Sequence, residues 1–438
     1  MTTETMTCDA PGRNWRRITR HPALMEYHRL VFLVVAVNLA VFTHGIWSRA
    51  WIVEGVYALG PIADMALINL SFSILIRQQR VVNALFWLAT RIPTSWPLWI
   101  RWGAGKVFHF GGLHSSGAVV GTLWLAFLAF AMAANRLGGS TLLPANLTLG
   151  LSGAMVVLML VMIITAVGPI RARFHNRFER VHRFVGWTVL ALFWAQTLSL
   201  THDTGGALLQ TPAFWALCVI TVSIISPWLT LKRVKVDIVK PSNHVVIAGF
   251  DYGDTPFAGS SNAISHTPFG EYHAFANIPT PGTAGYRLAI SRSGDWTGRF
   301  IDAPPRHVWV KGITTSGVAR IEALFTKVIY VGTGSGIGPI LPHLLKGQVP
   351  NRLIWSTRSP RKTYGDALVD EIKAHTDRPL IWDTDTRGKP DLSALALQAV
   401  RDTAAEAVIV ISNQKLTRKV VYDMETLGIP AYGAIWDS

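Results

Sequence analysis

The sequence predicts a six-helix transmembrane bundle in the first half of the chain and a soluble domain of strands and helices in the second. Of the 438 residues, 50% are hydrophobic and only 15% are charged. A helix needs about 20 apolar residues to cross a bilayer. After residue 240 the apolar runs shorten and alternate with Pro, Gly and Ser, which is typical of strands and turns. The candidate spans are roughly 30–48, 56–76, 108–133, 147–170, 184–203 and 211–231.

The basic residues between these runs predict the orientation of the bundle. The loops 48–55, 134–146 and 201–210 hold little positive charge, whereas the alternate segments are rich in Arg and Lys. Because cytoplasmic loops carry the excess of positive charge, we expect a multi-pass integral membrane protein with both termini and the soluble half in the cytoplasm. The basic residues are Arg13, Arg16, Arg17, Arg20, Arg77, Arg80, Arg91, Arg101, Lys106, Arg171, Arg173, Arg177, Arg180, Arg183, Lys232, Arg233 and Lys235.

The composition excludes several other classes of protein. Much of the net charge of +15 lies beside the apolar runs, where it sets topology and meets anionic lipid. No nucleic-acid motif is present, so we expect a lipid bilayer and no nucleic acid as a partner. The two cysteines, Cys8 and Cys218, lie far apart, which argues against a disulfide framework, a zinc site or an iron–sulfur cluster.

Two histidines in the apolar runs are candidate metal ligands. His114 lies in the third run, and His182 lies at the start of the fifth. An ionisable side chain inside a bilayer is costly and usually marks a functional site. Antiparallel counting brings both residues to a similar depth on the cytoplasmic side, where two imidazoles can hold a haem iron. The alternative is that each ring hydrogen-bonds a neighbouring helix or a headgroup.

The segment 327–345 has the pattern of a nucleotide-binding turn. An apolar strand runs into Gly332, Gly334, Gly336 and Gly338, and an apolar helical stretch follows. Glycines at such a turn let backbone amides approach a pyrophosphate at the helix N-terminus. Arg358 follows the next strand, 26 residues after Gly332, where a Rossmann-like half places its ribose-reading residue. A cation there favours NADPH over NADH, and the alternative is a solvated surface loop.

Three phrases carry a resemblance to a known family. Phe178-Glu179 precede His182, the phrase 271–276 (EYHAFA) lies in the soluble half, and 286–297 ends in Gly-Asp-Trp-Thr. Together they resemble the ferric reductase and NADPH oxidase superfamily. The greatest overall similarity is to fungal TmpA-like membrane flavoproteins, which the phrases around His114, His182 and the C-terminus resemble. The resemblance implies a ferredoxin-reductase-like module, an antiparallel β-barrel followed by a doubly wound α/β nucleotide domain. The expected domains are 1–232 (transmembrane), 233–325 (FAD-binding barrel) and 326–438 (NAD(P)-binding).

The same resemblance implies roles for single residues. His273 and Phe275 would pack along FAD, and Arg292 and Thr297 would contact its pyrophosphate. Trp436, an aromatic residue near the C-terminus, would cover the flavin ring. His273 and Trp436 are therefore the expected catalytic residues.

The sequence departs from the family pattern at three places. Ala276 replaces the usual Ser or Thr of the flavin phrase, and Ser412-Asn413-Gln414 replaces the usual Cys-Gly-Pro near nicotinamide. The second histidine of the third and fifth runs is also missing, so an outer haem is not expected.

The resemblance implies an NAD(P)H-dependent membrane flavin oxidoreductase. Electrons would pass from cytosolic NADPH through FAD to one inner b-type haem and then to a membrane-accessible acceptor. One alternative is a haem-free membrane flavoprotein that acts on a small metabolite. A second is a non-catalytic membrane protein that senses nucleotides.

Overall fold

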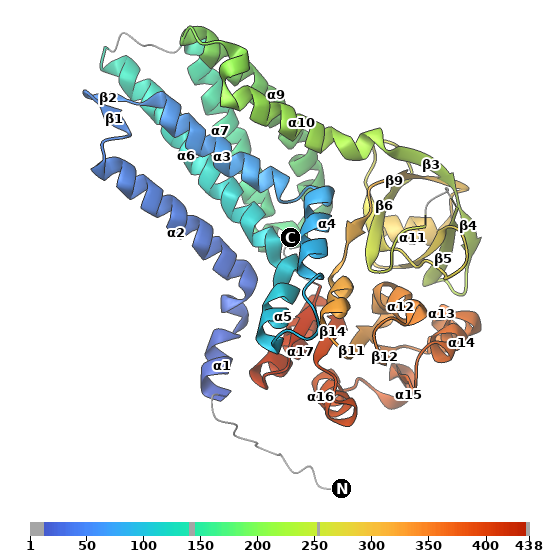
Figure 1. Ribbon diagram of the computed structural model, residues 1–438. Helices are drawn as coiled ribbons and strands as arrows, with labels where there is room; N and C mark the ends of the chain where they lie inside the picture. The colour runs from blue at the N-terminus through green and yellow to red at the C-terminus, as the bar shows by residue number, and fades with distance from the viewer. Residues whose placement is uncertain (1–12, 140–144, 252–254, 435–438) are drawn as a thin grey trace. The chain divides into compact units, whose positions relative to one another are not determined.

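The computed structural model describes residues 13–139, 145–251 and 255–434 (Figure 1). The chain divides into two compact units, each built from segments that are not contiguous in sequence. Among the described residues, the helical unit contains Glu26–Gln78 and Phe110–Ser226, and the mixed unit contains residues 13–25, Gln79–His109 and 227–434. Each unit has its own hydrophobic core.

Each of the six apolar runs forms a helix. These helices belong largely to the helical unit, which also holds a short hairpin of β1 (Ile52–Val53) and β2 (Val56–Tyr57) and two short helices, α8 (Gly168–Arg173) and η3 (Leu208–Gln210). The helices of the six runs are α2 (Glu26–Trp47), α3 (Leu59–Leu75), α6 (Gly111–Leu137), α7 (Asn146–Ala166), α9 (His175–Asp203) and α10 (Pro212–Leu229).

Small residues let α6 pack closely against α3. A Cβ added to Gly121 would lie 2.6 Å from Leu70 Cγ, and one added to Gly117 would lie 3.1 Å from the Asn69 carbonyl oxygen. The two glycines are four residues apart, so they fall on one face of α6. Close approach at glycines spaced in this way is common between helices that associate in lipid.

Buried amides connect three helices of the same unit. Asn38 of α2 and Asn69 of α3 exchange hydrogen bonds through their side-chain amides, at 3.0 and 2.8 Å. Trp124 of α6 donates its indole N–H to Asn38 Oδ1 at 2.9 Å. Buried polar groups need partners, and these three residues satisfy one another.

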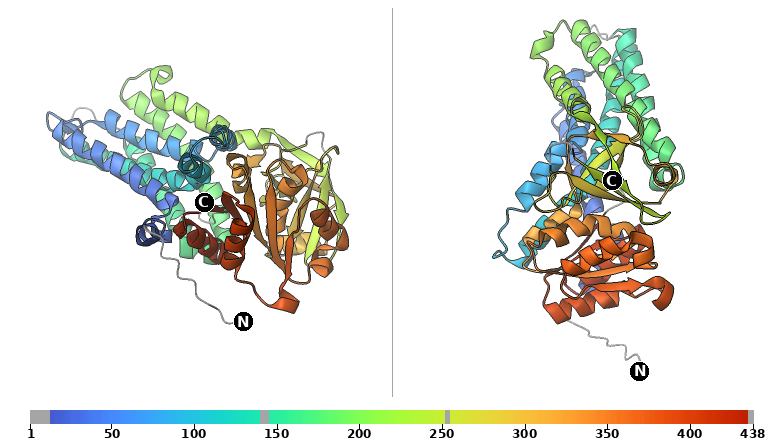
Figure 2. Two further views of the ribbon diagram at one scale, coloured as in Figure 1. Left: turned by 60° about the horizontal axis from the view of Figure 1, so that its bottom comes forward. Right: turned by 90° about the vertical axis from the view of Figure 1, so that its right-hand side faces the viewer.

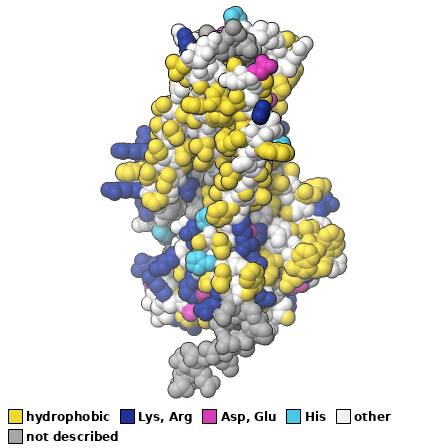
Figure 3. Space-filling model, turned by 90° about the vertical axis from the view of Figure 1, so that its left-hand side faces the viewer, with side chains coloured by type: hydrophobic (Ala, Val, Ile, Leu, Met, Phe, Trp, Pro, Cys, Tyr) yellow, Lys and Arg dark blue, Asp and Glu magenta, His cyan; other side chains and the backbone are white. Residues whose placement is uncertain are grey.

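The lengths and surfaces of these helices suit an apolar environment. Among the described residues, five helical segments are long and apolar enough to cross a membrane, and a sixth would count if α3 and α4 (Gln79–Ala89), bent by 73°, were one span. Large apolar side chains such as Phe32, Leu123 and Val157 are exposed on their surfaces. Figure 3 shows hydrophobic side chains covering much of one face of this unit.

The mixed unit begins, after residue 230, with an antiparallel barrel. One sheet has the order β10-β6-β9-β3 with β7 paired to β6, and the other has the order β4-β5-β8. Alternate residues of these strands face the core, which includes Val246, Leu288 and Val310. The elements are β3 (Leu231–Lys235), β4 (Asp237–Val239), β5 (Val245–Phe250), β6 (Ser260–Ser265), β7 (His273–Ala276), β8 (Tyr286–Ser291), α11 (Asp295–Asp302), β9 (His307–Lys311) and β10 (Thr315–Ser316).

A parallel sheet with the order β13-β12-β11-β14-β15 follows the barrel. This order reverses direction between β11 and β14, as in doubly wound α/β domains. Ile329 and Val331 pack in one core with residues of α16 and α17, whereas Tyr330 lies near His343 of α12, so helices cover both faces (Figure 2). The elements are η4 (Val318–Leu324), β11 (Val328–Thr333), η5 (Gly334–Gly336), α12 (Ile337–Lys346), β12 (Asn351–Thr357), α13 (Pro360–Tyr364), α14 (Asp366–Ala374), β13 (Leu380–Asp383), α15 (Thr384–Arg387), α16 (Leu392–Thr403), β14 (Ala407–Ile411), α17 (Gln414–Thr426) and β15 (Ala431–Gly433).

The segment Gln79–His109 packs on the mixed unit through polar contacts. Its helices are α4 and α5 (Leu98–Ala104), and the 3₁₀ turn η2 (Gly105–Phe110) follows. Asn83 of α4 accepts hydrogen bonds from the backbone and side chain of Ser316 at 2.8 and 2.9 Å, and Tyr432 donates its hydroxyl to the Trp102 carbonyl at 3.0 Å. The predicted transmembrane domain of residues 1–232 grouped this segment with the apolar helices. The sequence did not reveal its packing, because the hydrogen-bond partners of Asn83 and Trp102 lie more than 200 residues further along the chain.

At the N-terminus, α1 (Arg13–Thr19) and the 3₁₀ turn η1 (Pro22–Leu24) belong to the same unit. Arg20 lies 4.5 Å from the Trp102 ring centroid.

Candidate functional site

The glycine-rich turn lies at the carboxyl end of β11, where the sheet order reverses. The chain passes from β11 through the 3₁₀ turn η5 directly into α12. Gly334 has φ +49, a left-handed conformation that favours glycine. The Trp355 indole N–H donates to the Gly334 carbonyl at 3.0 Å and holds the turn against β12. The strand, turn and helix that the glycine pattern predicts are therefore present.

Gly336 permits the closest approach in the turn. A Cβ at this position would lie 2.1 Å from the Ile411 carbonyl oxygen, which is backbone at the end of β14. At Gly332 an added Cβ would lie 2.8 Å from Ile340 Cδ1, the end of a flexible side chain. At Gly338 it would meet only Ala289 Cβ, at an ordinary 3.6 Å. The glycines therefore differ in structural role, and Gly336 is the one whose missing side chain lets α12 begin beside β14.

Two hydroxyls meet at the carboxyl ends of β11 and β14. Thr333 Oγ1 and Ser412 Oγ lie 2.6 Å apart, within hydrogen-bonding distance. Asn413 caps the N-terminus of α17, where its Oδ1 accepts from the Leu416 amide at 3.0 Å. Ligands of doubly wound sheets bind outside these strand ends, at the point where the order reverses. Ser412 and Thr333 are thus the side chains at the centre of the candidate site.

Arg358 lies beyond the end of β12 and is 84% exposed. Its Nε donates to Asp385 Oδ1 at 3.1 Å, and Ser359 donates its hydroxyl to Asp385 Oδ2 at 2.8 Å. The hydrogen bonds from Ser359 and then Arg358 lower the pKa of the Asp385 carboxyl. The guanidinium is therefore exposed and close to the strand ends, but it already has an acidic partner that a bound phosphate would have to displace.

His273 and Phe275 of β7 face the barrel interior and not the outside. Both rings pack on Trp296, with centroid distances of 4.5 and 6.0 Å. Trp296 is buried and also stacks on Phe300 of α11. The residues between and after them, Ala274 and Ala276, lie on the opposite face of the strand. The predicted contacts of His273 and Phe275 with FAD stay predictions.

Arg292 and Thr297 are both engaged in the turn that leads into α11. Arg292 forms a bidentate ion pair with Asp302, at 3.0 and 2.5 Å, which raises the pKa of the guanidinium. Thr297 Oγ1 accepts from the amides of Ser293 and Gly294 at 2.9 and 3.1 Å. Thr297 thus stabilises the turn, and its predicted pyrophosphate contact stays a prediction.

Two helix N-termini of the mixed unit offer backbone amides that suit a pyrophosphate. The first-turn amides of an eight-residue helix, α11, have no acceptors within their own helix, and such amides suit a pyrophosphate. The beginning of α12, next to Gly334 and Gly336, offers the same chemistry at the parallel sheet. The start of α11 and the start of α12 are therefore two places in the mixed unit whose backbone chemistry suits a pyrophosphate.

The two candidate metal ligands of the helical unit lie close together. The rings of His114 in α6 and His182 in α9 have a centroid distance of 6.1 Å and an interplanar angle of 68°. His114 Nδ1 lies 2.8 Å from the Ser73 carbonyl oxygen, and the Ser73 hydroxyl donates to the His114 carbonyl at 2.8 Å. Within the described residues no group of three or more His, Cys, Asp or Glu could hold a metal ion. Metal binding by this pair stays a prediction.

Several site residues escaped the sequence analysis, and one predicted residue cannot be placed. Trp436 lies outside the described residues. Thr333, Trp355 and Asp385 carry no motif that marks them. Thr333 ends β11 and Asp385 closely follows β13, which was a usable signal, whereas Trp355 lies inside β12. Ser412 was noted only as a departure from a family pattern.

Comparison with known proteins identifies relatives of a different kind from those expected. The family model for the C-terminal domain of adenylate-forming reductase 03009 matches residues 318–438. Adenylate-forming reductase 03009 of Coprinopsis cinerea is 42% identical over 441 residues, which cover 98% of this chain and 42% of that protein. Adenylate-forming reductase 06235 of the same fungus is 40% identical with the same coverage. The chain thus spans less than half the length of these curated relatives.

Among solved structures, the chain is similar to a ferredoxin NADP+ reductase from Neisseria gonorrhoeae with bound FAD and NADP. The TM-score is 0.39 at 13% identity, and the match covers 47% of this chain and 98% of that one.

These relatives correct the sequence-based assignment. The resemblance to the ferric reductase and NADPH oxidase superfamily, and to TmpA-like flavoproteins, was wrong, because the proteins that match almost the whole chain are named adenylate-forming reductases. The function that depended on this resemblance, a membrane relay from FAD to a b-type haem, is wrong for the same reason. The short phrases that suggested it do not identify one family.

Proposed function

We propose that the chain is an NAD(P)H-dependent flavin reductase. FAD would bind on the barrel, and the nicotinamide nucleotide would bind at the carboxyl ends of β11 and β14. The observation that carries the proposal is the strand–glycine turn–helix at Gly332–Gly338, placed where the sheet order reverses and directly after an antiparallel barrel. The reductase name of the relatives that match 98% of the chain supports the same activity.

In this proposal the chain's own residues bind and orient, and the cofactors supply hydride and electron transfer. The amides around Gly334 and Gly336 would hold the pyrophosphate of the nucleotide. The Thr333–Ser412 hydroxyl pair would donate a hydrogen bond to a polar group at the strand ends, and the Ser412 hydroxyl is free to rotate toward it. On the barrel, the first-turn amides of α11 would hold the flavin pyrophosphate, because the amides of Ser293 and Gly294 already donate to Thr297 Oγ1.

The preference for NADPH rests on Arg358. A guanidinium binds a phosphate through charge-assisted hydrogen bonds, and the Arg358 side chain is 84% exposed beyond the end of β12. Asp385 competes with that phosphate for the guanidinium. Substituting the two residues should therefore have opposite effects on the affinity for NADPH, and little effect on the affinity for NADH.

The apolar helices support a membrane location for the same protein. We infer that α2, α3, α6, α7, α9 and α10 cross a bilayer, with the mixed unit in the cytoplasm. The length and hydropathy of the helices support the crossing, and the arginines of the loops support the orientation. The lipid bilayer would then be a partner of the helical unit.

The test uses the full chain purified in a neutral detergent. Bound FAD is measured by absorbance, and flavin reduction by NADPH and by NADH is followed under anaerobic conditions. R358Q should lower the affinity for NADPH by about tenfold and D385N should raise it, because charge-assisted hydrogen bonds contribute roughly 1.5–3 kcal/mol. Asp377, an exposed acid that precedes β13 whereas Asp385 follows it, provides the control D377N. A protein that neither binds FAD nor can be loaded with it would refute the proposal.

A further inference from the structure

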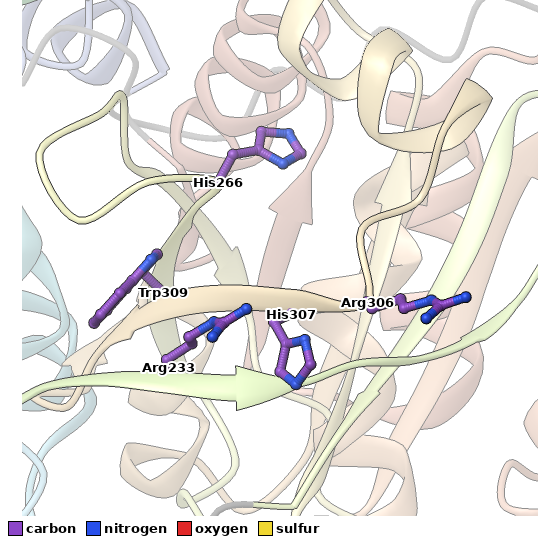
Figure 4. Close-up of a pocket in the computed structure, with 5 residues that line it drawn as sticks. All are labelled: Arg233, His266, Arg306, His307 and Trp309. Atoms are coloured by element: carbon purple, nitrogen blue, oxygen red, sulfur yellow. The ribbon is translucent and has the colours of Figure 1, made fainter.

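A basic pocket lies on the barrel, beside strands β3 and β9. Its volume is about 590 Å³, and its lining consists of two arginines, two histidines and one tryptophan (Figure 4). None of these described lining residues is acidic. They are Arg233, His266, Arg306, His307 and Trp309.

The strand register places most of these side chains on one face. Arg233 of β3 pairs with Trp309 of β9 in the antiparallel ladder. Val234 and Val308 point the other way and are buried in the core. Because side chains alternate along a strand, Arg233, His307 and Trp309 share the outward face. Arg306 directly precedes β9 and contributes a second guanidinium to the lining of the pocket.

The positive charge of this pocket has no internal counter-charge. Arginines elsewhere on the same unit form ion pairs, as Arg287 does with Glu371 and Arg292 does with Asp302. In the described part of the chain, neither Arg233 nor Arg306 lies within ion-pairing distance of a carboxylate. Cations gathered without acids create a local positive potential that attracts anions.

We propose that this pocket binds a phosphate group. The guanidinium forks of Arg233 and Arg306 suit phosphate oxygens, and the imidazoles of His266 and His307 add donors for a doubly charged ester. Trp309 provides an apolar wall beside the group that carries the phosphate. None of the five lining residues has a role in the proposed flavin or nucleotide binding, so the inference goes beyond the proposed function.

The phosphate could belong to a lipid headgroup or to a soluble phosphate ester, and neighbouring residues favour a headgroup. Lys311 follows Trp309 on the same face of β9, and its Nζ lies 4.5 and 4.4 Å from the ring centroids of Trp228 and Tyr272. Phe269 stacks on Trp228 and is 73% exposed. Aromatic and cationic side chains together are typical of the bilayer interface.

The first arm of the test uses inorganic phosphate as the probe. Phosphate is titrated calorimetrically into the full chain in neutral detergent, and R233Q and R306Q should each weaken binding by about tenfold. R401Q removes the same charge from an exposed arginine of α16 and should leave binding unchanged. Phosphate should also leave the affinity for FAD unchanged. Competition with FAD would assign the pocket to the flavin site and would overturn the proposal.

The second arm tests lipid. The full chain is reconstituted in phosphatidylcholine nanodiscs with and without phosphatidic acid, and hydrogen exchange is measured over residues 303–311. Protection that requires phosphatidic acid, and that is lost in R306Q but kept in R401Q, supports a headgroup. Phosphate binding in detergent without this protection supports a soluble ester. The proposal is overturned when neither arm shows an effect that depends on Arg233 or Arg306.

Discussion

Arg101 and Glu406, 305 residues apart in the chain, form a bidentate ion pair. Arg101 Nη1 donates to Glu406 Oε2 at 2.8 Å, and Nη2 donates to Oε1 at 3.0 Å. Arg101 also donates to the carbonyls of Leu324 and Trp96, and its side chain is only 6% exposed. Since Leu324 and Glu406 precede β11 and β14, this pair attaches α5 to the end of the sheet opposite the glycine-rich turn.

We expect E406Q to destabilise the mixed unit. The substitution removes the carboxylate and leaves the guanidinium of Arg101 buried with no charged partner. Loss of a charge-assisted bond of this kind costs about 2–3 kcal/mol. The measurement is urea unfolding of the full chain in neutral detergent. D377N, which neutralises an exposed carboxylate elsewhere, should change the unfolding free energy by less than about 0.5 kcal/mol. Equal effects of the two substitutions would show that the ion pair contributes nothing specific.

The same pair predicts a dependence of stability on pH. The Arg101 hydrogen bond holds the pKa of Glu406 below its ordinary value of 4.5. A depressed pKa in the folded state means that the stabilisation is complete above the unfolded value and is lost as the pH falls through the folded value. The difference in stability between wild type and E406Q should therefore persist at neutral pH and shrink below about pH 4. A difference that grows on acidification would contradict the assigned sign.

The glycines of the turn should respond very differently to alanine. G336A places a methyl group 2.1 Å from backbone of β14, whereas G338A meets only an ordinary contact. We expect G336A to destabilise the mixed unit by about 1–3 kcal/mol, as overpacking does, and to lower NADPH affinity at least tenfold. G338A is the matched control and should retain both properties. Nucleotide titration by fluorescence, together with urea unfolding, distinguishes the two variants. Normal NADPH binding by G336A would exclude the turn as the nucleotide site.

Ser412 should affect the rate of flavin reduction more than binding of FAD. Its hydroxyl lies at the strand ends and contacts Thr333, so S412A removes one donor where the nicotinamide is expected. Loss of about 1.4 kcal/mol of stabilisation in the transition state slows the reaction tenfold. Stopped-flow reduction by NADPH measures the rate, and T426V, which removes a hydroxyl bonded within α17, is the control. An unchanged rate in S412A would place the reacting ring elsewhere.

Much of the secondary structure could be predicted because its signals are local. Apolar runs near the length of a bilayer span predicted the six helices of α2, α3, α6, α7, α9 and α10. The strand, glycines and helix between residues 327 and 345 were predicted in the same way. Residue roles were harder to predict: Thr297 stabilises its own turn, and His273 packs on Trp296, because neighbouring side chains are not visible in a local phrase.

Family resemblance proved less reliable than the local patterns. The phrases around His182 and Thr297 are short, and proteins with different functions can share them. The matches that cover 98% of the chain replaced the ferric-reductase assignment with relatives named adenylate-forming reductases.

The sequence alone determined which segments are apolar helices and where a glycine-rich turn joins a strand to a helix, because both depend on residues that are close together in the chain. Only the tertiary structure brought Arg101 to Glu406, Thr333 to Ser412, and Arg233 to Trp309. These pairs lie on separate elements, and their distances follow from sheet order and helix packing. No periodicity within one element encodes such distances, so the chemistry that depends on them could be recognised only in the folded chain.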